Sequence, residues 1–262
     1  MGSLEGKVAF ITGAARGQGR SHAIRLASMG ADIITGDLCG QIDSIPYPMS
    51  TPEDLRTTVK EVEALGRRIY AAQLDVRDEA AVREVVAAGV ADVGPVDIVL
   101  IAHGMLPEQS LCENDLLLCR DTLEVNAVSP ALFAEAFAGH FAKAGRGTLA
   151  IIGSVAGDRG RKANYTYGAC KGLVARYAEG LEHRFAGTGV SVVLIKPGPT
   201  DTPMAAAHRA SGRRLASVEQ VARATVRGID AKRPVVYAPA QWALIMFVVR
   251  HLPRFVFNRL NL

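Results

Sequence analysis

Short apolar runs alternate along the chain with longer segments of helical periodicity. Several of these runs, among them VAFI, IVLI and VVLI, are continuously apolar, which is typical of strands covered on both faces. The predicted strands are Val8–Thr12, Asp32–Gly36, Arg68–Leu74, Val96–Ala102, Gly147–Gly153, Val190–Lys196 and Pro234–Ala238. The predicted helices are Ser21–Met29, Pro52–Leu65, Glu79–Ala91, Leu116–Ala144, Tyr167–Ala186 and Val218–Asp230.

This alternation predicts an α/β fold with right-handed βαβ crossovers and a doubly wound parallel sheet between two helix layers, a three-layer α/β/α arrangement. No internal repeat or low-complexity linker divides the chain, so we expect a single domain over residues 1–262. Ligands of such sheets bind beyond the carboxyl ends of the strands. The residues that follow each predicted strand are therefore the candidates for a site.

Composition narrows the class of protein. Hydrophobic residues make up 49% of the chain and charged residues 21%, which predicts a packed core rather than a disordered chain. No stretch has the roughly 20 apolar residues that a membrane-spanning helix needs. Because the first apolar run is already a predicted strand and no signal pattern precedes it, we expect a cytoplasmic protein.

The net charge of +4 favours anionic partners only weakly, and an aromatic content of 6% argues against a nucleic-acid surface. The four cysteines are Cys39, Cys112, Cys119 and Cys170, and their spacing matches neither a metal site nor a CxxC motif. We expect no metal site and interpret the cysteines as small apolar residues of the core.

A glycine-rich turn follows the first predicted strand and leads into an apolar helix. In it, Gly13 permits a tight turn, Gly17 lets the backbone approach a pyrophosphate, and Gly19 allows close packing of helix and strand. The helix that follows presents free N–H groups and its positive dipole end to the phosphates. We therefore predict a dinucleotide site here that includes the intervening Arg16 and Gln18.

The second predicted strand ends at Asp37, which is followed by Leu38. A carboxylate at this place accepts the ribose hydroxyls of an adenosine and repels a 2′-phosphate. Asp37 therefore favours NAD(H). NADP(H) stays open as an alternative, because the guanidinium of Arg16 is able to hold a 2′-phosphate.

Candidate catalytic groups stand at the fifth strand and on the helix after it. Ser154 follows the strand, and Tyr167 and Lys171 are spaced i and i+4, so they share one helix face. The Lys171 ammonium, together with the positive charge of a nicotinamide ring, lowers the pKa of a phenol toward the working range, which makes Tyr167 the predicted acid/base. Ser154 would orient the substrate oxygen, and Asn126 would position a water that relays protons to Lys171. The alternative is a purely structural Tyr/Lys pair.

Together these residues resemble the classical short-chain dehydrogenase/reductase family over essentially the whole chain. The resemblance implies a Rossmann-type sheet, a Ser-Tyr-Lys-Asn tetrad, and a homotetramer, with the cofactor bound mainly by about 1–125 and the substrate by about 126–262. It also implies cofactor contacts from Tyr167 and Lys171 themselves and from Asp75, Val76, Gly104, Pro197, Gly198 and Thr202.

One segment departs from the family pattern. After the fourth strand the family has Asn-Asn-Ala-Gly, whereas this chain has Ile101-Ala102-His103-Gly104. Gly104 keeps the backbone close to the cofactor, but the asparagine that braces the sheet is missing. We interpret His103 as a packing residue, and an acid/base role is the less favoured alternative.

The two halves resemble different branches of the family. Residues 36–55, with Tyr47 between two prolines, resemble the insertion of mycofactocin-associated, carveol-dehydrogenase-like enzymes, which implies a tightly held NAD under the insertion. The stretches around Asp158–Arg161 and Asp201–Met204 resemble decaprenylphosphoryl keto-sugar reductases. The alternative for the insertion is an ordinary surface loop.

Two later segments bear on the substrate. Residues 199–217 are the predicted substrate lid and contain the basic residues His208, Arg209, Arg213 and Arg214, which are most simply read as a solvated face. The apolar segment Trp242–Val249 is followed by Arg250, His251, Arg254 and Arg259. Such a tail either packs against another subunit or makes peripheral contact with a membrane.

The sequence thus predicts an NAD(P)-dependent oxidoreductase that moves a hydride between the nicotinamide and a secondary alcohol or ketone. The expected substrate is a lipophilic or prenyl-linked small molecule. Two other functions stay open. One is a membrane-peripheral keto-sugar-lipid reductase, and the other is a non-catalytic NAD-binding module.

Overall fold

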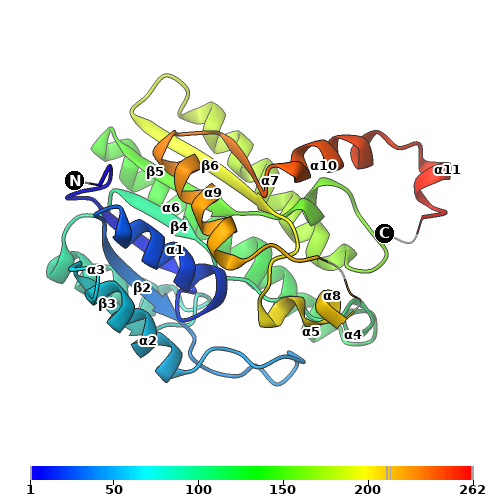
Figure 1. Ribbon diagram of the computed structural model, residues 1–262, viewed down its shortest axis with the longest axis horizontal. Coiled ribbons are helices and arrows are strands. Elements are labelled where there is room, and N and C mark those ends of the chain that lie inside the picture. The colour runs from blue at the N-terminus through cyan, green and yellow to red at the C-terminus, as the bar shows by residue number, and fades with distance from the viewer. Residues whose placement is uncertain (1, 211, 213, 261–262) are drawn as a thin grey trace.

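The computed structural model describes every residue except Met1, Ser211, Arg213, Asn261 and Leu262. Within the described residues one parallel sheet holds seven strands in the order β3-β2-β1-β4-β5-β6-β7 (Figure 1). The order reverses at β1, which places the predicted ligand crevice at the carboxyl ends of β1 and β4. The strands are β1 Val8–Thr12, β2 Asp32–Asp37, β3 Ile69–Gln73, β4 Ile98–Ile101, β5 Gly147–Ile152, β6 Val190–Pro197 and β7 Val235–Ala238.

Helices cover both faces of this sheet, as the apolar runs predict. One face packs against α1 Gly17–Ser28, α2 Pro52–Glu63 and α9 Val218–Asp230. The other packs against α3 Glu79–Val93, α6 Ser129–Ala144 and α7 Tyr165–Arg184. Strands β1, β2 and β4 are buried at every position, because each has helices on both sides. The predicted α/β, three-layer, single-domain fold is therefore confirmed.

The predicted helix over 116–144 is interrupted in the structure. It consists of α5 Leu116–Leu123, a π-helical turn over Glu124–Val128, and α6. The turn contains Asn126, and its closing hydrogen bond runs from the Ser129 N–H to the Glu124 carbonyl. A π turn adds one residue to the helix without ending it, so the hydrophobic periodicity continues across it.

Other predicted bounds need small corrections. The first helix begins at Gly17 rather than at Ser21, because the glycine-rich turn is itself the start of the helix. The helix of the candidate tyrosine begins at Tyr165, two residues earlier than predicted. Shorter helices not predicted from the periodicity are α4 Gln109–Asn114, α8 Ala206–Ala210, α10 Gln241–His251 and α11 Arg254–Phe257.

The last two helices form a tail that extends beyond the sheet, at the right of Figure 1. They follow β7, the last strand at that edge. Among the described residues, no helix is long and apolar enough to cross a membrane.

Candidate active site

The glycine-rich turn brings the start of α1 against the loop after β4. Gly13 and Gly17 have positive φ angles of 73° and 57°, which non-glycine residues rarely adopt. A Cβ on Gly13 would lie 3.1 Å from the Cα of His103, and one on Gly19 would lie 2.0 Å from the carbonyl oxygen of Gly13. The inner side of the turn therefore packs directly against neighbouring backbone atoms, and its other side lines the pocket.

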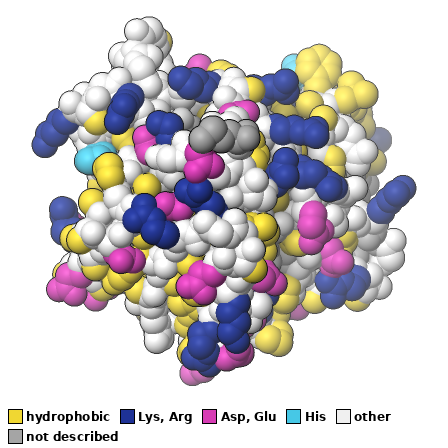
Figure 2. Space-filling view, turned by 60° about the vertical axis from the view of Figure 1, so that its left-hand side comes forward, with side chains coloured by type: hydrophobic (Ala, Val, Ile, Leu, Met, Phe, Trp, Pro, Cys, Tyr) yellow, Lys and Arg dark blue, Asp and Glu magenta, His cyan; other side chains and the backbone are white. Residues whose placement is uncertain are grey.

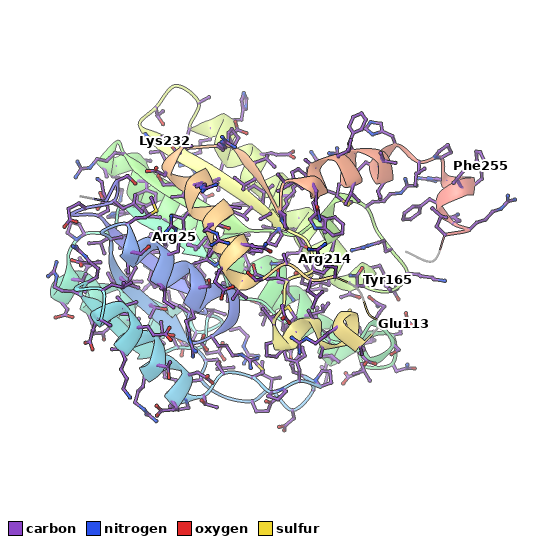
Figure 3. The ribbon with its side chains drawn as sticks, viewed as in Figure 1. Arg25, Glu113, Tyr165, Arg214, Lys232 and Phe255 are labelled. Carbon is purple, nitrogen blue, oxygen red and sulfur yellow. The ribbon has the colours of Figure 1, made fainter. Side chains whose placement is uncertain are left out.

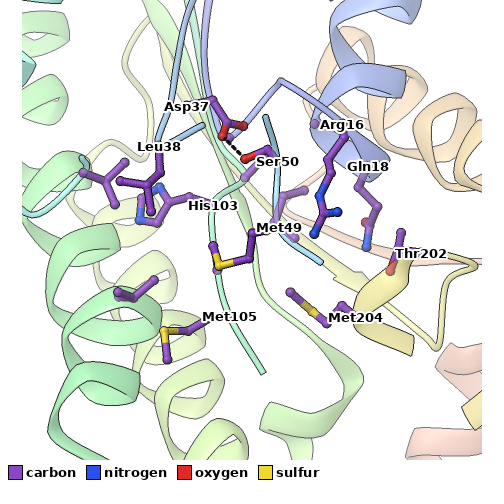
Figure 4. A pocket seen from close by; sticks show the side chains of 18 of the residues that line it. Arg16, Gln18, Asp37, Leu38, Met49, Ser50, His103, Met105, Thr202 and Met204 are labelled. Carbon is purple, nitrogen blue, oxygen red and sulfur yellow. Dashed lines mark hydrogen bonds between the residues drawn. The ribbon is translucent and has the colours of Figure 1, made fainter. Parts of the chain in front are cut away.

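The start of α1 has unused hydrogen-bonding groups. Its N-cap residue Arg16 makes no side-chain cap, and the first turn carries no acidic residue, so an anion would meet free backbone N–H groups. The buried Oε1 of Gln18 has no hydrogen-bond partner. Arg16 and Gln18 both project from the turn into the pocket in Figure 4. These features fit a pyrophosphate and an amide or hydroxyl donor.

Asp37 is buried at the end of β2 and is held by three donors. Its carboxylate accepts hydrogen bonds from Ala15 N–H at 2.9 Å, from Cys39 N–H at 3.2 Å, and from the Ser50 hydroxyl at 2.6 Å. The last of these is the dashed line in Figure 4. Because Ser50 is the far end of the loop that follows β2, this bond closes the loop over the pocket.

The loop over residues 38–51, which we call the insertion, is held together by the side chain of Gln41. The Gln41 side chain donates to the carbonyls of Ile42 and Ile45 at 3.0 and 3.1 Å and accepts from Met49 N–H at 3.0 Å. At its tip, the Tyr47 hydroxyl accepts from Leu106 N–H at 3.1 Å. The insertion therefore joins Asp37 on one side of the pocket to the loop after β4 on the other.

The insertion is also packed, unlike an ordinary surface loop. Buried Ile45 belongs to a small apolar cluster with Met105 and Leu118, and partly buried Ile42, Tyr47 and Met49 pack against it. The cluster joins the insertion to α5 and to the loop before α4. The insertion is thus a wall of the pocket.

Asp75 and Val76 line the pocket beyond β3, together with Arg77. Arg77 forms an ion pair with Asp75 at 2.6 Å, and this hydrogen-bonded guanidinium lowers the pKa of the Asp75 carboxyl. Asp75 is therefore an anion held in a fixed orientation at the pocket wall, with Val76 beside it, and its contact with an adenine ring stays a prediction.

Tyr167 and Lys171 lie on the face of α7 that turns toward the pocket. The Lys171 ammonium donates to the Ile152 carbonyl at 2.9 Å and lies 5.7 Å from the centre of the Tyr167 ring. Burial lowers the pKa of Lys171 to about 8. The ammonium is thus buried and aimed along the same side of the pocket as the phenol.

The pKa of Tyr167 in the protein alone is set mainly by burial. Burial raises the pKa of this phenol to about 12, while a hydrogen bond with Ser154 acts in the opposite direction. The lowering expected from Lys171 together with the nicotinamide charge stays a prediction, because in the protein alone the loss of water from around the phenol has the largest effect on its pKa.

Asn126 does not face the pocket. Its side-chain amide donates to the carbonyls of Met105 and Thr122, both at 2.9 Å, and its Oδ1 accepts from Met105 N–H at 3.1 Å. A Cβ on Gly104 would lie 2.9 Å from the same Oδ1. Asn126 therefore joins the π turn to the loop after β4, and its side-chain groups are already engaged.

His103 replaces the missing sheet brace. One ring nitrogen is 2.8 Å from the Thr12 hydroxyl at the end of β1, and the other is 3.2 Å from the Ser129 hydroxyl at the start of α6. Burial lowers the pKa of His103 to about 3, so the ring is neutral, one nitrogen donating and the other accepting. His103 therefore joins β1 to α6 in place of the missing asparagine, and both of its ring nitrogens are engaged away from acid/base work.

One pocket collects most of the predicted site residues. Those that line it are Gly13, Arg16, Gly17, Gln18, Gly19, Asp37, Leu38, Asp75, Val76, Gly104, Tyr167, Lys171 and Thr202. Ser154 and Asn126 stand behind the lining, next to Tyr167 and Val125 respectively. Pro197 and Gly198 also lie outside it, because Gly198 packs so closely on Trp242 that a Cβ there would be 1.9 Å from the indole nitrogen.

The pocket also includes residues that the motifs did not single out as site residues. They are Ile42, Tyr47, Met49, Ser50, Leu74, Arg77, Met105, Val125, Ile152, Pro203 and Met204. Most of them belong to the insertion or to the predicted lid. The lid itself contains a turn over Pro203–Ala205 and helix α8, while Arg213 and the side chain of His208 lie outside the described residues.

The fold, the phosphate turn and the Tyr-x3-Lys pair together define a nucleotide-dependent oxidoreductase. The family model described as short chain dehydrogenase matches residues 7–212. The chain therefore belongs to the short-chain dehydrogenase family, and the predicted family and enzyme class are confirmed.

Among particular proteins, the chain is 40% identical over 205 residues to an uncharacterised NAD-dependent oxidoreductase of Mycobacterium tuberculosis, covering 78% of this chain and 74% of the relative. It is 35% identical over 207 residues to a (-)-trans-carveol dehydrogenase of Rhodococcus erythropolis, with coverage of 78% and 74%. A carveol dehydrogenase of Mycobacterium avium, solved with NAD, superposes with a TM-score of 0.82 at 29% identity, covering 90% of this chain and 96% of the other.

These relatives confirm the resemblance to carveol-dehydrogenase-like enzymes. A short-chain dehydrogenase of Mycobacterium paratuberculosis, also solved with NAD, has a TM-score of 0.81 at 33% identity and covers 89% of this chain and 96% of the other. The preference for NAD(H) expected from Asp37 agrees with both bound structures. The resemblance of the second half to keto-sugar reductases stays a prediction.

Proposed function

We propose that this protein is an NAD-dependent dehydrogenase/reductase that interconverts a lipophilic secondary alcohol and its ketone. The observation that carries the proposal is the half-buried Tyr167 and the buried Lys171 in the same pocket as the glycine-rich turn and Asp37. This arrangement joins a proton donor to a dinucleotide site. A packing pair of Tyr and Lys would not need to face an open pocket.

The chain's own residues have separable roles in this proposal. Tyr167 exchanges a proton with the substrate oxygen, and Ser154, hydrogen-bonded to Tyr167, orients that oxygen. Lys171 binds the cofactor and holds a positive charge near the phenol. Asn126 shapes the loop that carries Gly104. When bound, NAD⁺ accepts the hydride and adds a positive charge beside the phenol, which favours the phenolate.

Asp37 and the insertion support NAD as a firmly held cofactor. The carboxylate faces the ribose position and disfavours a 2′-phosphate, although Arg16 and Arg77 line the same region. The insertion is fastened on both sides of the pocket, at Ser50 and at Tyr47. Slow exchange of the nucleotide follows from that covering.

The walls of the pocket support a lipophilic substrate. The apolar side chains in the pocket lining include Ile42, Met49, Met105, Val125 and Met204. A terpenoid or prenyl-linked alcohol would bury its hydrocarbon part there. A keto-sugar attached to a prenyl chain is the alternative substrate, and it differs in its polar ring.

A cytoplasmic homotetramer is part of the same proposal. The cysteines of the chain are free, as expected in a reducing compartment. Exposed leucines lie on α5, α6 and α7, with Leu116 80% exposed, Leu132 62% and Leu173 46%. Such a face on adjacent helices fits burial against other copies of the chain.

Tyr167→Phe tests the proposal, because it removes one hydroxyl and keeps the ring. We expect turnover to fall by about 10²–10⁴-fold with carveol and other secondary alcohols, while NADH binding is retained. Tyr165→Phe is the matched control, because that tyrosine is exposed, lies on the same helix and does not line the pocket. Equal turnover by Tyr167→Phe and wild type would refute the proposal. Tyr167-dependent turnover of keto-sugar lipids, with none of simple secondary alcohols, would change the proposed substrate to a prenyl-linked keto-sugar.

A further inference from the structure

Helix α10 turns an apolar stripe toward solvent. Leu244, Phe247, Val248 and His251 are spaced i, i+3, i+4 and i+7, so they share one face of the helix. Leu244 is 71% exposed and Phe247 61%. Surface helices normally carry polar residues on the solvent side, whereas α10 carries apolar residues there.

The opposite face of α10 is already used to hold the helix to the body. Met246 is 3% exposed, and the Trp242 indole packs against Gly198 after β6. Trp242, Met246 and Val249 are spaced i, i+4 and i+7, which is the inner stripe of the same helix. The exposed stripe is therefore additional apolar surface.

A single arginine from the catalytic side of the sheet caps the end of α10. Arg159 donates to the carbonyls of Val249 and Leu252 at 2.5 and 2.7 Å. Its guanidinium also lies 3.7 Å above the Phe257 ring of α11. These carbonyls are among those left without partners at a helix end, so the tail has a defined position.

The charge of the tail has one sign. Residues 241–260 contain no acidic residue, and their cations are Arg250, Arg254 and Arg259. The face of the molecule in Figure 2 instead carries cationic and anionic side chains interspersed. In α11, the exposed Arg254 is followed by Phe255, which is 68% exposed and lies at the outer end of the tail (Figure 3).

We propose that α10 and α11 form a docking surface for an anionic lipid bilayer. The apolar side chains would enter the acyl boundary, and the arginines would meet lipid phosphates and carboxylates. A second copy of the chain fits less well, because a two-fold contact would bring cationic tails together. Spanning is excluded by length, since the 11 residues of α10 reach roughly 16 Å.

The docking surface lies at the edge of the sheet that holds the pocket. Trp242 contacts the loop after β6, and Arg159 follows the turn that begins at Ser154. A bilayer bound to the tail would therefore be adjacent to the carboxyl ends of the strands. This inference rests on the tail residues and holds whichever substrate the pocket takes.

Co-sedimentation with vesicles tests the docking surface on the full chain. We expect binding to equimolar phosphatidylglycerol and phosphatidylcholine, much weaker binding to phosphatidylcholine alone, and loss of binding in high salt. Leu244→Gln/Phe247→Gln removes exposed apolar area, and Arg254→Glu/Arg259→Glu reverses two charges that have no ion pair among the described contacts. Each double variant should lower the partition coefficient by at least about tenfold.

Matched controls separate the tail from general stickiness. Leu65→Gln/Val90→Gln removes exposed apolar residues in the turn after α2 and on α3, and Lys143→Glu/Arg146→Glu makes the same charge change close to the amino end of β5. Both controls should bind like wild type. Equal losses in tail and control variants would overturn the proposal. So would a wild type that ignores anionic vesicles while Leu244→Gln/Phe247→Gln lowers its oligomeric mass, since a second copy would then cover the tail.

Discussion

Asp37 shows how one side chain sets the cofactor preference. Its buried carboxylate is fixed by Ala15, Cys39 and Ser50, so it is not able to turn away from a 2′-phosphate. Two cations, Arg16 and Arg77, line the pocket nearby. The balance between the anion and the cations therefore decides which nucleotide binds.

Replacing Asp37 with serine should shift that balance. We expect the ratio of kcat/KM for NADPH to that for NADH to rise by at least about tenfold, because repulsion is removed while the cations remain. Initial-rate measurements with both nucleotides check this. Asp43→Ser, a change in the insertion away from the pocket lining, should leave the ratio unchanged. An unaltered ratio in the Asp37 variant would assign the preference to another group.

Burial of the Lys171 ammonium lowers the stability of the folded protein. Burial lowers its pKa from 10.5 to about 8. Below pH 8 the ammonium is charged in both states and its burial opposes folding. Between about pH 8 and 10.5 the unfolded chain binds more protons than the folded one, so the free energy of unfolding rises with pH.

Lys171→Met should therefore be inactive yet more stable. In the nucleotide-free protein near pH 7 we expect the free energy of unfolding to rise by about 1–3 kcal/mol. Loss of the hydrogen bond to the Ile152 carbonyl reduces this gain, and the gain becomes smaller as the pH approaches 10.5. Urea unfolding at several pH values measures the difference. A variant that is less stable than wild type at pH 7 would show that the buried ammonium is a net support of the fold.

Local motifs made part of the site predictable. The glycine turn and the Tyr-x3-Lys pair contain their chemistry within a few residues, so the sequence alone identified them. Ser50 and Arg77 could not be predicted from the sequence, because their roles depend on contacts with Asp37 and Asp75 in the folded chain. The raised pKa of Tyr167 could not be predicted for a similar reason, since burial is a property of the packed pocket.

At the scale of elements, the insertion covers the pocket and is attached on both sides of it, through Ser50 and Tyr47. Strands and long helices were predictable because their periodicity is strong, whereas the insertion has none and its order comes from Gln41 and from apolar packing. The π turn was also hidden, because one added residue leaves a helical pattern almost unchanged.

Tyr47→Phe should loosen this cover. The variant keeps the ring in its apolar cluster and loses the bond to Leu106, so we expect NADH to dissociate several-fold faster with the fold intact. Stopped-flow displacement of NADH measures the rate. Tyr70→Phe on β3, outside the pocket lining, is the control. Dissociation at the wild-type rate would mean that the bond at the tip does not limit release.

At the scale of the whole molecule, the exposed leucines predict assembly. Leu132→Glu places a charge in the proposed contact between copies, and we expect the tetramer to dissociate into smaller species. Light scattering after size-exclusion chromatography reports the mass. Leu65→Glu, on the opposite helix layer, should keep the wild-type mass. A monomeric wild type would remove the tetramer from the proposal.

Arg159 has a consequence for how this chain can diverge. Because its guanidinium holds peptide oxygens of the tail, the attachment does not depend on most tail side chains. Substitutions at Leu244 or Arg254 can therefore accumulate without detaching the helices from the catalytic edge. The exposed surface of the tail can therefore change to suit a different binding partner, while the attachment of the tail and the active site stay the same.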